Sequence, residues 1–455
     1  MEKTFPKDIP SVSKVMHQLK NVVNIHQSYL KKIIQKEIET IRRNVKNGYV
    51  NKSKDELITD IKQKVLNKAS PKLQNVINGT GIVLHTGFGR APYNAKSLKD
   101  LANKMEGYIS LEYDLENGKR GDRQEHVREF LSAICESESS LVVNNNAAAV
   151  LLSINGLANG GEVIVSRGEL VEIGGSFRIP DIIEASGATL REVGTTNRTH
   201  FQDYKNAINK NTKLILTVHT SNYVIKGFTK SVELGELVSL GKKNTIPVMV
   251  DWGSGSFVSD IPNNPSLDIP INKLMKSKPD IITFSGDKLI GGPQSGIIVG
   301  KKSIIDLFQA NTLYRTLRPD KLTIALLEEI LRTYNIHGFT DDNISLSLLS
   351  SSRRSLTVRG NKVMNLIQKS KVKDYGIKLI ESKVEAGSGS SPEKKFSSMA
   401  IVFESESVKC SVLAKKFRKG KIPVVGYIKN NKFYIDLKAV LPNQLIKLSQ
   451  AINSV

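Results

Sequence analysis

One lysine, Lys288, stands among glycines in the run Ile281-Ile-Thr-Phe-Ser-Gly-Asp-Lys-Leu-Ile-Gly-Gly-Pro-Gln-Ser-Gly296, shortly after an apolar stretch. A short apolar stretch bounded by turn residues is typical of a buried strand, and ligands of open α/β sheets bind beyond the carboxyl ends of the strands. Burial there lowers the pKa of a lysine and frees its amine as a nucleophile. Lys288 is therefore a candidate Schiff-base former, and the plain alternative is a solvated loop lysine.

Apolar runs and helix-like segments alternate on both sides of this run. Such alternation predicts an α/β body with a largely parallel, buried sheet. The expected strands are residues 140–143, 163–166, 190–193, 214–218, 248–251, 281–284 and 296–299, and the expected helices are residues 147–158, 170–186, 201–209 and 231–243.

Two other expected strands end in residues that suit a cofactor. Asp251 ends the strand 248–251, where a carboxylate can pair with a protonated ring nitrogen or simply cap a turn. The run Asn144-Asn-Asn-Ala147 follows the strand 140–143 and opens a helix, whose free N–H groups favour a phosphate, although an ordinary Asn N-cap explains it as well. Ser285, three residues before Lys288, can also hydrogen-bond a phosphate. A phosphate loop, a carboxylate and a lysine in this order indicate a pyridoxal-phosphate (PLP) site.

The charge of the chain is concentrated at its two ends. The 455 residues include 66 Lys and Arg against 44 Asp and Glu, a net charge of +22. Residues 1–70 carry +8, residues 71–340 only +2, and residues 341–455 carry +12. Such an excess favours a polyanionic partner, nucleic acid or an anionic membrane, with a lysine-rich surface of no function as the alternative.

The two ends also differ from the middle in their pattern. Residues 11–47 have a helical apolar period that Gly48 would end, and a second helix is expected over 54–68. This basic helical module presents either a solvated face or a face that follows phosphates. From residue 340 on we expect α+β structure, with connecting segments at 345–355 and 386–392 and antiparallel strands at 399–403 and 432–437. The expected domains are residues 1–71, 72–338 and 339–455.

The cysteines and the N-terminus limit the compartment. Cys135 and Cys410 lie far apart, and the sequence has no CxxC or Cys/His cluster, so we expect no metal site. A reducing cytoplasm fits this cysteine usage. The N-terminus lacks the apolar run of a signal peptide, and no run of about 18 apolar residues could span a membrane. We expect a cytoplasmic protein with no membrane partner.

Long contiguous runs match one known family: residues 78–86, 89–92, 111–115, 118–121, 142–150, 165–180, 193–197, 218–222 and 284–296. On these runs the sequence resembles, over essentially its whole length, the bacterial selenocysteine synthases, the L-seryl-tRNA(Sec) selenium transferase family. The resemblance implies a fold-type-I PLP enzyme, similar to aspartate aminotransferase, with a small N-terminal helical module and a C-terminal α+β domain.

The resemblance also implies roles for residues of the site. Lys288 would carry PLP as an internal aldimine, and Asp251 would keep the pyridinium nitrogen charged. The phosphate of PLP would be approached by Asn145, Asn146, Ala147 and Ser285.

Other residues match family positions on the substrate side. Arginine suits an anionic donor such as selenophosphate, because guanidinium binds phosphate oxygens bidentately; a surface ion pair is the alternative for any single arginine. The run Tyr314-Arg-Thr-Leu-Arg318 keeps the paired spacing of the family. The matching residues are Arg90, Arg123, Arg315 and Arg318, with Thr195 and Thr196 near the incoming donor.

The implied reaction converts L-seryl-tRNA(Sec) to L-selenocysteinyl-tRNA(Sec) with selenophosphate, through a PLP aldimine and an aminoacrylyl-tRNA. The family forms homo-oligomers, a decamer built as a pentamer of dimers, which the sequence alone does not show. Gly87, Phe88 and Trp252 differ from the residues that are common at these positions in the family, so the detailed shape of the substrate pocket is not predicted.

The sequence leaves two other functions to compare with this one. A stand-alone PLP lyase of the same superfamily would act on a small phosphorylated amino compound, but such proteins generally lack the basic module present here at residues 1–70. A non-catalytic RNA-binding protein would not need Lys288 and Asp251. How tRNA(Sec) is told from ordinary seryl-tRNA, and whether the C-terminal charge contacts RNA, are not predicted from the sequence.

Overall fold

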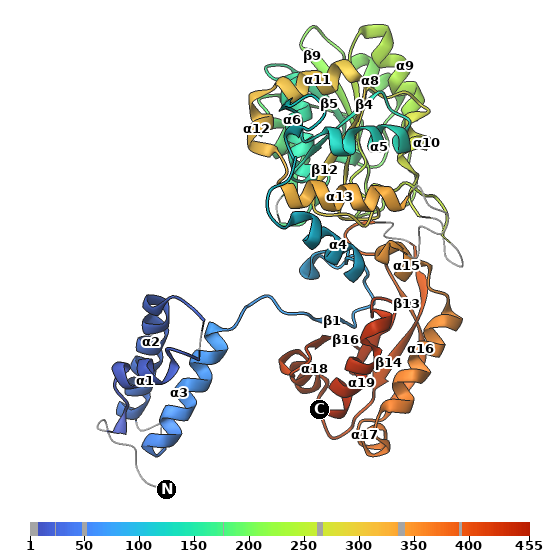
Figure 1. The fold of residues 1–455 in the computed structure, drawn as a ribbon. Helices are drawn as coiled ribbons and strands as arrows, with labels where there is room; N and C mark the ends of the chain where they lie inside the picture. Colours follow the sequence, from blue (N-terminus) through green and yellow to red (C-terminus); the bar gives the residue numbers. More distant parts are fainter. Residues whose placement is uncertain are drawn as a thin grey trace. The chain divides into compact units, whose positions relative to one another are not determined.

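The computed structural model describes residues 8–22, 24–47, 52–175, 177–261, 267–334, 342–390 and 394–455. It divides into two compact units, Met1–Asn75 and Val76–Val455 (Figure 1). The expected boundary after residue 71 lies just before this division. The expected boundary at residues 338–339 falls outside the described residues, and the three-domain division stays a prediction.

In the described residues of unit 1, three helices pack around an apolar core that includes Val15, Ile34 and Ile61. The prediction of one helical stretch over 11–47 is wrong in its middle, because the chain leaves the helix after Leu19 and restarts at His26, whose Nδ1 accepts from the Ser28 N–H at 3.3 Å. The prediction over 54–68 is confirmed, and Ser53 with Glu56 forms a capping box there. Gly48 lies outside the described residues. The helices are α1 (Val12–Leu19), α2 (Gln27–Lys46) and α3 (Lys54–Ala69).

Unit 2 is built on a seven-stranded sheet in the order β4-β12-β11-β10-β9-β5-β8. The strand β12 runs antiparallel to β4 and β11, and the other neighbouring pairs are parallel. All seven predicted strands are confirmed to within two residues at each end. The strands are β4 (Ser139–Val143), β5 (Glu162–Ser166), β8 (Thr189–Val193), β9 (Thr212–Val218), β10 (Val248–Asp251), β11 (Ile281–Ser285) and β12 (Gly296–Gly300).

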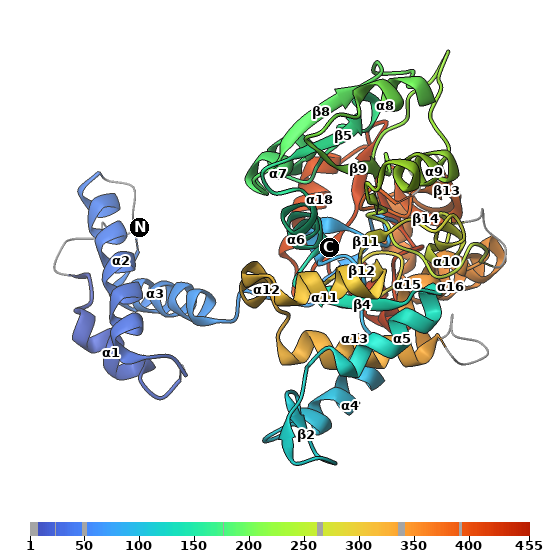
Figure 2. The same ribbon diagram turned by 90° about the horizontal axis from the view of Figure 1, so that it is seen from above.

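Helices cover both faces of this sheet, which explains why its strands read as continuous apolar runs (Figure 2). One face packs against α6 (Asn146–Ala158), α7 (Ile179–Ala185), α11 (Lys302–Ala310) and α12 (Thr312–Leu317). The other packs against α5 (Glu125–Cys135), α8 (Phe201–Ala207), α9 (Leu234–Asn244), α10 (Ile271–Met275) and α13 (Lys321–Thr333).

One predicted helix of this body, over 170–186, is wrong in its first half. The segment instead forms a hairpin of β6 (Glu172–Ile173) and β7 (Phe177–Arg178) before α7 begins. Gly174 and Gly175 allow the turn because both have positive φ, 45° and 87°. Pro180 then stands in the first turn of α7, where proline is well tolerated.

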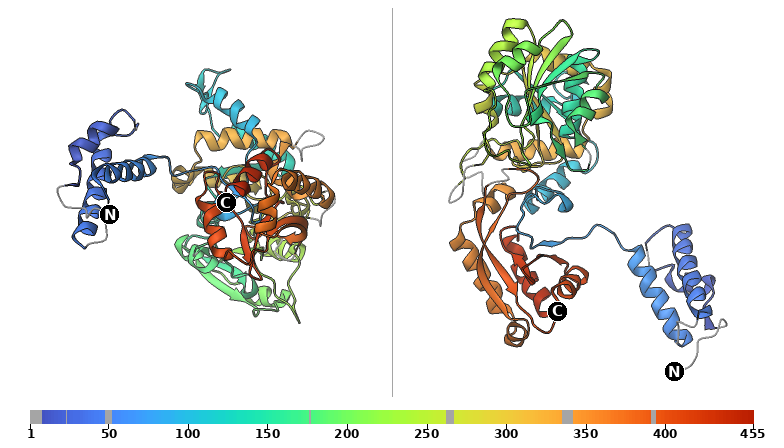
Figure 3. Two further views of the ribbon diagram at one scale, coloured as in Figure 1. Left: turned by 90° about the horizontal axis from the view of Figure 1, so that it is seen from below. Right: turned by 180° about the vertical axis from the view of Figure 1, so that it is seen from behind.

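The C-terminal part of unit 2 is a four-stranded antiparallel sheet with helices packed against it, which confirms the expected α+β structure (Figure 3). The expectation of a connecting segment over 345–355 is wrong, because its serines begin or lie within helices; Ser352, for example, accepts from the Ser355 N–H at 3.2 Å. The elements are α15 (Ile344–Ser350), α16 (Arg353–Leu366), β13 (Ile377–Val384), β14 (Phe396–Phe403), α18 (Cys410–Lys419), β16 (Tyr427–Lys429), β17 (Lys432–Asp436) and α19 (Leu445–Asn453).

The first residues of unit 2 connect its two largest sheets. β1 (Ile77–Asn78) pairs in parallel with β15 (Val424–Val425), and the Asp436 N–H donates to Gly79 O at 2.8 Å. The chain then passes to the seven-stranded body, where the Ala91 N–H donates to Asp287 O at 3.3 Å. Residues 77–91 therefore run from the C-terminal sheet to the neighbour of Lys288. Among the described residues, no helix combines the length and the apolar character needed to cross a membrane.

Candidate active site

The predicted lysine and carboxylate lie together at the carboxyl edge of the seven-stranded sheet. Asp251 ends β10 and is paired in register with Thr283 of β11, and Lys288 follows the end of β11 by three residues. Both side chains are buried; Asp251 is 4 % and Lys288 is 5 % exposed. The sequence order of the strands therefore brings these two groups to one buried place.

Hydrogen bonds hold the Asp251 carboxylate in position. Its Oδ1 accepts from Asn146 Nδ2 at 2.9 Å and from Thr283 Oγ1 at 3.2 Å. Burial raises the pKa of Asp251, while the Asn146 bond, the charge of Lys288 and the Thr283 bond each act to lower it. The position of the carboxylate is therefore fixed by two neighbouring side chains.

Burial also acts on Lys288. Loss of solvent lowers the pKa of its amine, and the charge of Arg90 lowers it further, while Asp251 acts in the opposite direction. A lower pKa means that a larger fraction of the amine is neutral near pH 7. A neutral amine is what nucleophilic attack and proton abstraction both need.

The residues around Lys288 fit a flat, polar cofactor such as PLP. A Cβ placed on Gly253 would lie 3.7 Å from Lys288 Nζ, 3.7 Å from Asn146 Nδ2 and 4.0 Å from Asp251 Oδ1, so the missing side chain leaves room among these groups. In the described part of the chain, the buried Asn146 Oδ1 and His219 Nδ1 have no hydrogen-bond partner. Buried polar atoms normally have partners, which a polar ligand would supply.

A stacked ring pair stands next to this space. The imidazole of His219, which follows β9, lies 3.8 Å from the Trp252 ring at an interplanar angle of 12°. The backbone N–H of His219 donates to the backbone O of Asp251 at 2.9 Å, which joins the two chain segments that carry this pair and the carboxylate. Sequence reasoning did not single out His219; its place directly after a buried strand was the available signal.

The start of α6 is arranged partly as predicted. Asn145 is its N-cap, with Oδ1 accepting from the Ala148 N–H at 2.8 Å, and the Asn146 side chain is bound to Asp251. The two amide side chains are therefore engaged within the protein, and the first backbone N–H groups, including that of Ala147, are what α6 offers an anion. Ser285 is buried at the end of β11.

Arg90 lies beside Lys288 through an ion pair with Asp287. Its backbone has a φ of 62°, the left-handed region that residues other than glycine seldom adopt. Asp287 is buried and adjacent in sequence to Lys288, yet it was not among the predicted site residues.

The remaining predicted substrate residues lie in two other places of the same chain. Arg123 and Arg318 both donate to Glu112, beside a cavity of about 330 Å³ that Arg315 also lines. Thr195 and Thr196 are exposed in the loop after β8. Thr196 lines a separate cavity of about 620 Å³ together with His219 and Trp252.

Comparison with known proteins shows the family of the chain. Residues 76–441 match the family described as L-seryl-tRNA selenium transferase. The chain belongs to this family. Three curated relatives carry the name L-seryl-tRNA(Sec) selenium transferase: one from Alkaliphilus oremlandii (41 % identical, 98 % of each chain covered), one from Caldanaerobacter subterraneus subsp. tengcongensis (42 %, 97 % of this chain and 96 % of the relative) and one from Aquifex aeolicus (37 %, 100 % and 99 %).

A solved structure shares the fold. D-Glucosaminate-6-phosphate ammonia-lyase superposes with a TM-score of 0.61 at 17 % identity, covering 84 % of this chain and 95 % of that chain. At this identity the likeness concerns the fold alone. The family resemblance and the fold-type-I α/β architecture expected from the sequence are both confirmed.

Proposed function

We propose that the protein converts L-seryl-tRNA(Sec) to L-selenocysteinyl-tRNA(Sec), with selenophosphate as the selenium donor and PLP held at Lys288. The observation that carries the proposal is the buried pair of Lys288 and Asp251 at the ends of adjacent strands, in a chain of the selenium transferase family. We place the reaction in the cytoplasm, which the two buried free cysteines, Cys135 and Cys410, fit.

Lys288, Asp251, Ser285 and the start of α6, from Asn145 to Ala147, would hold the cofactor. When bound, PLP supplies an electron sink for the negative charge that develops at the seryl α-carbon. The hydrogen bonds that Asn146 and Thr283 donate to Asp251 favour its charged form against the effect of burial, and that charge would pair with a protonated ring nitrogen. The Lys288 amine, whose pKa burial lowers, is positioned to take the α-proton of the seryl group.

The donor is assigned to the arginines and to Thr195 and Thr196, because an oxyanion binds several guanidinium groups strongly. Arg90 stands beside Lys288 of its own chain, while Arg123, Arg315 and Arg318 gather around Glu112. We propose that a second copy of the chain completes the site, so that arginines of one subunit bind the donor next to Lys288 of another. The proposed assembly is the homo-oligomer implied by the family resemblance, a decamer of five dimers.

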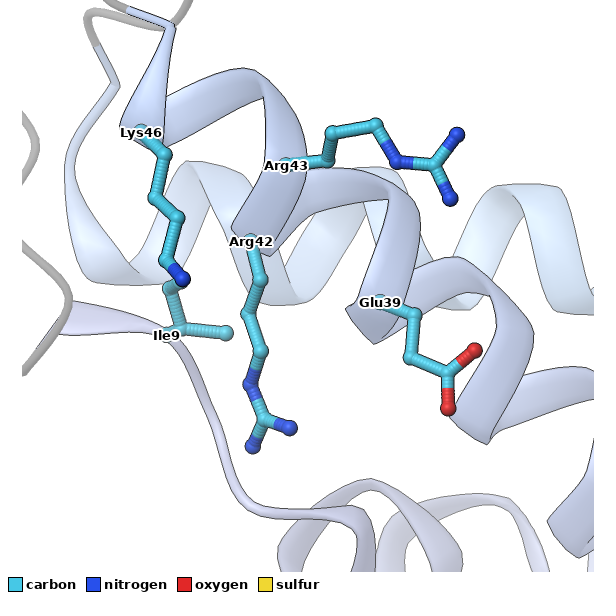
Figure 4. Close-up of a pocket in the computed structure, with 5 residues that line it drawn as sticks. All are labelled: Ile9, Glu39, Arg42, Arg43 and Lys46. Atoms are coloured by element: carbon cyan, nitrogen blue, oxygen red, sulfur yellow. The ribbon is translucent and has the colours of Figure 1, made fainter.

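The basic N-terminal module is assigned to the tRNA. Arg42, Arg43 and Lys46 on α2 surround a cavity of about 390 Å³ with Ile9 and Glu39. Figure 4 shows Arg42 and Lys46 extending toward Ile9 and Arg43 extending away from it. Basic side chains on two sides of one helix can contact several phosphates of a nucleic-acid backbone, whereas a single small anion would need them to converge on one point.

Selenium transfer to seryl-tRNA(Sec) tests this function. Purified protein with PLP, labelled selenophosphate and seryl-tRNA(Sec) is expected to give labelled aminoacyl-tRNA, and ordinary seryl-tRNA serves as the control. Equal labelling of both tRNAs would contradict the proposed substrate, and no labelling of either would contradict the reaction.

A further inference from the structure

A carboxylate occupies the centre of the arginine cluster that lies away from Lys288. The cluster is formed by the hairpin of β2 (Tyr113–Asp114) and β3 (Lys119–Arg120), the loop before α5, and α12 with the residue after it. Its cavity of about 330 Å³ is lined by Glu112, Arg120, Asp122, Tyr314, Arg315 and Arg318, among others.

Three guanidinium groups converge on Glu112. Its Oε1 accepts from Arg123 Nε at 2.8 Å, from Arg123 Nη2 at 2.7 Å and from Arg318 Nη1 at 3.1 Å. Its Oε2 accepts from Arg120 Nη2 at 3.0 Å. These bonds, above all those from Arg123, hold the pKa of Glu112 below its usual value, so it is ionised at neutral pH.

The inner part of the cluster is buried and hydrogen-bonded, and the outer part is exposed. The Arg123 side chain is 14 % exposed and its Nη1 also donates to Pro319 O at 2.5 Å, whereas Arg120 is 75 % exposed. In the described part of the chain, no hydrogen bond or ion pair engages the exposed Arg315 guanidinium. The other carboxylate of the cavity, Asp122, is bound to Arg128 and Gln309 instead.

A carboxylate and a phosphate-type oxyanion make the same kind of charge-assisted bonds to arginine. The position of Glu112 Oε1 is therefore one that an oxygen of an incoming oxyanion would take, and the like charges of the two groups repel. An anion that approaches this cavity meets Arg315 free but must compete with Glu112 for Arg318 and Arg123.

We propose that Glu112 is a built-in counter-anion that limits the affinity of the arginine cluster for oxyanions. Glu112 holds Arg123 and Arg318 in position in the free enzyme. Because an oxyanion must displace it from these arginines, Glu112 raises the dissociation constant of any oxyanion, and inorganic phosphate is bound weakly. This inference rests on the proposed function, in which the arginines receive the selenium donor.

The test uses the full-length enzyme with PLP and inorganic phosphate as the probe, measured as a competitive inhibitor against selenophosphate. In Glu112→Gln the competing charge is gone but the side chain keeps its size. The inhibition constant of phosphate and the KM of selenophosphate are each expected to fall about tenfold, while the KM of seryl-tRNA(Sec) stays unchanged. The matched control is Glu328→Gln, which removes a carboxylate paired with Arg332 on α13 outside the cavity and is expected to change neither constant.

Visible absorbance of bound PLP and circular dichroism report whether Glu112→Gln keeps its fold. Glu112→Asp, which retains the charge on a shorter arm, is the second variant and is expected to bind phosphate no more tightly than the unmodified enzyme. A phosphate inhibition constant that is unchanged or higher in Glu112→Gln would overturn the inference and leave the arginine site standing. Two results together would overturn the donor site itself and the inference with it. Phosphate would fail to compete with selenophosphate in the unmodified enzyme, and Arg318→Gln would have an unchanged KM for selenophosphate.

Discussion

At the scale of single residues, the chemistry depends on how burial changes Lys288 and Asp251. Each is a titratable side chain in a place where water is largely excluded; hydrogen bonds from Asn146 and Thr283 favour the charged form of Asp251, and the charge of Asp251 acts against the effect of burial on Lys288. Lys288 and Asp251 were predictable because each follows an apolar strand in a pattern that packing does not explain. Asp287 and Glu112 were not, because an acid in a loop carries no such signal until the fold brings Arg90 or Arg123 to it.

Replacing Asp251 by asparagine removes the charge that faces the ring nitrogen of the cofactor. The Asn146 and Thr283 bonds can still be made in part, so the protein should fold and bind PLP. We expect the turnover of seryl-tRNA(Sec) to fall by about a hundredfold or more, because the electron sink is weakened. Single-turnover kinetics measures this. Thr283→Val removes one hydrogen bond to the carboxylate but keeps the carboxylate itself, and it is expected to lower the rate less than Asp251→Asn does. Equal rates for Asp251→Asn and the unmodified enzyme would remove Asp251 from the mechanism.

At the scale of elements, the alternation of strands and helices predicted the central sheet because strands buried on both faces have a strong apolar signature. The hairpin at 172–178 and the helices that begin in the Ser-rich stretch were missed for local reasons. Paired glycines allow the hairpin turn, and the N-caps Asn343 and Ser352 start the two helices α15 and α16. Serine and glycine occur both in loops and at the ends of helices and strands. The residues around them decide whether they form a loop or start or end an element.

Close packing of β12 against the start of α6 positions the cofactor site. A Cβ on Gly296 would lie 2.0 Å from Asn145 O, so Gly296→Ala forces the backbone of one element to move. We expect a loss of about 1–3 kcal/mol in the free energy of unfolding and weaker PLP binding. Urea unfolding and cofactor titration measure these, with Gly235→Ala on α9 as the control because no atom lies within 4 Å of its added Cβ. Unchanged stability and PLP affinity in Gly296→Ala would show that this contact is not needed.

A buried lysine in the C-terminal sheet predicts a pH dependence of stability. Lys438 is fully buried, donates to Ser351 O at 2.9 Å, and has a pKa that burial lowers to about 8 from 10.5. Between these two values the unfolded chain holds a proton that the folded chain has lost, so this residue makes stability rise with pH. Relative to Lys438→Met, the unmodified protein should gain about 2 kcal/mol between pH 8 and pH 10.

Urea unfolding at the two pH values checks this expectation. Lys447→Met, at an exposed position on α19, is the control and should show no such difference. A free energy of unfolding of the unmodified protein that falls relative to that of Lys438→Met as the pH rises would contradict the assigned direction.

At the scale of the whole molecule, the charge distribution matches a division of labour. The nearly neutral middle contains Lys288 and Asp251, and the basic N-terminal residues fall in a compact unit of their own, Met1–Asn75. The composition predicted which parts of the chain are basic but not how the basic side chains are arranged in space. No sequence pattern could show that residues 77–80 pair with the C-terminal part of the chain, because the partners lie more than 300 residues away in the sequence.

Deleting residues 1–71 should separate the two activities. Because unit 1 has its own apolar core, we expect the shortened protein to keep the visible absorbance of bound PLP and to lose tRNA affinity by about tenfold or more. Filter binding over a range of salt concentrations measures this. Affinity for tRNA that is unchanged by the deletion would place the tRNA contacts elsewhere in the chain.

The most direct test of the central claim compares the unmodified enzyme with Lys288→Ala in transfer of labelled selenium to seryl-tRNA(Sec). We expect the variant to fold, to lack the visible absorbance of lysine-bound PLP, and to transfer no selenium above background. Selenium transfer by Lys288→Ala at the rate of the unmodified enzyme would contradict the assignment of Lys288 and, with it, the proposed mechanism.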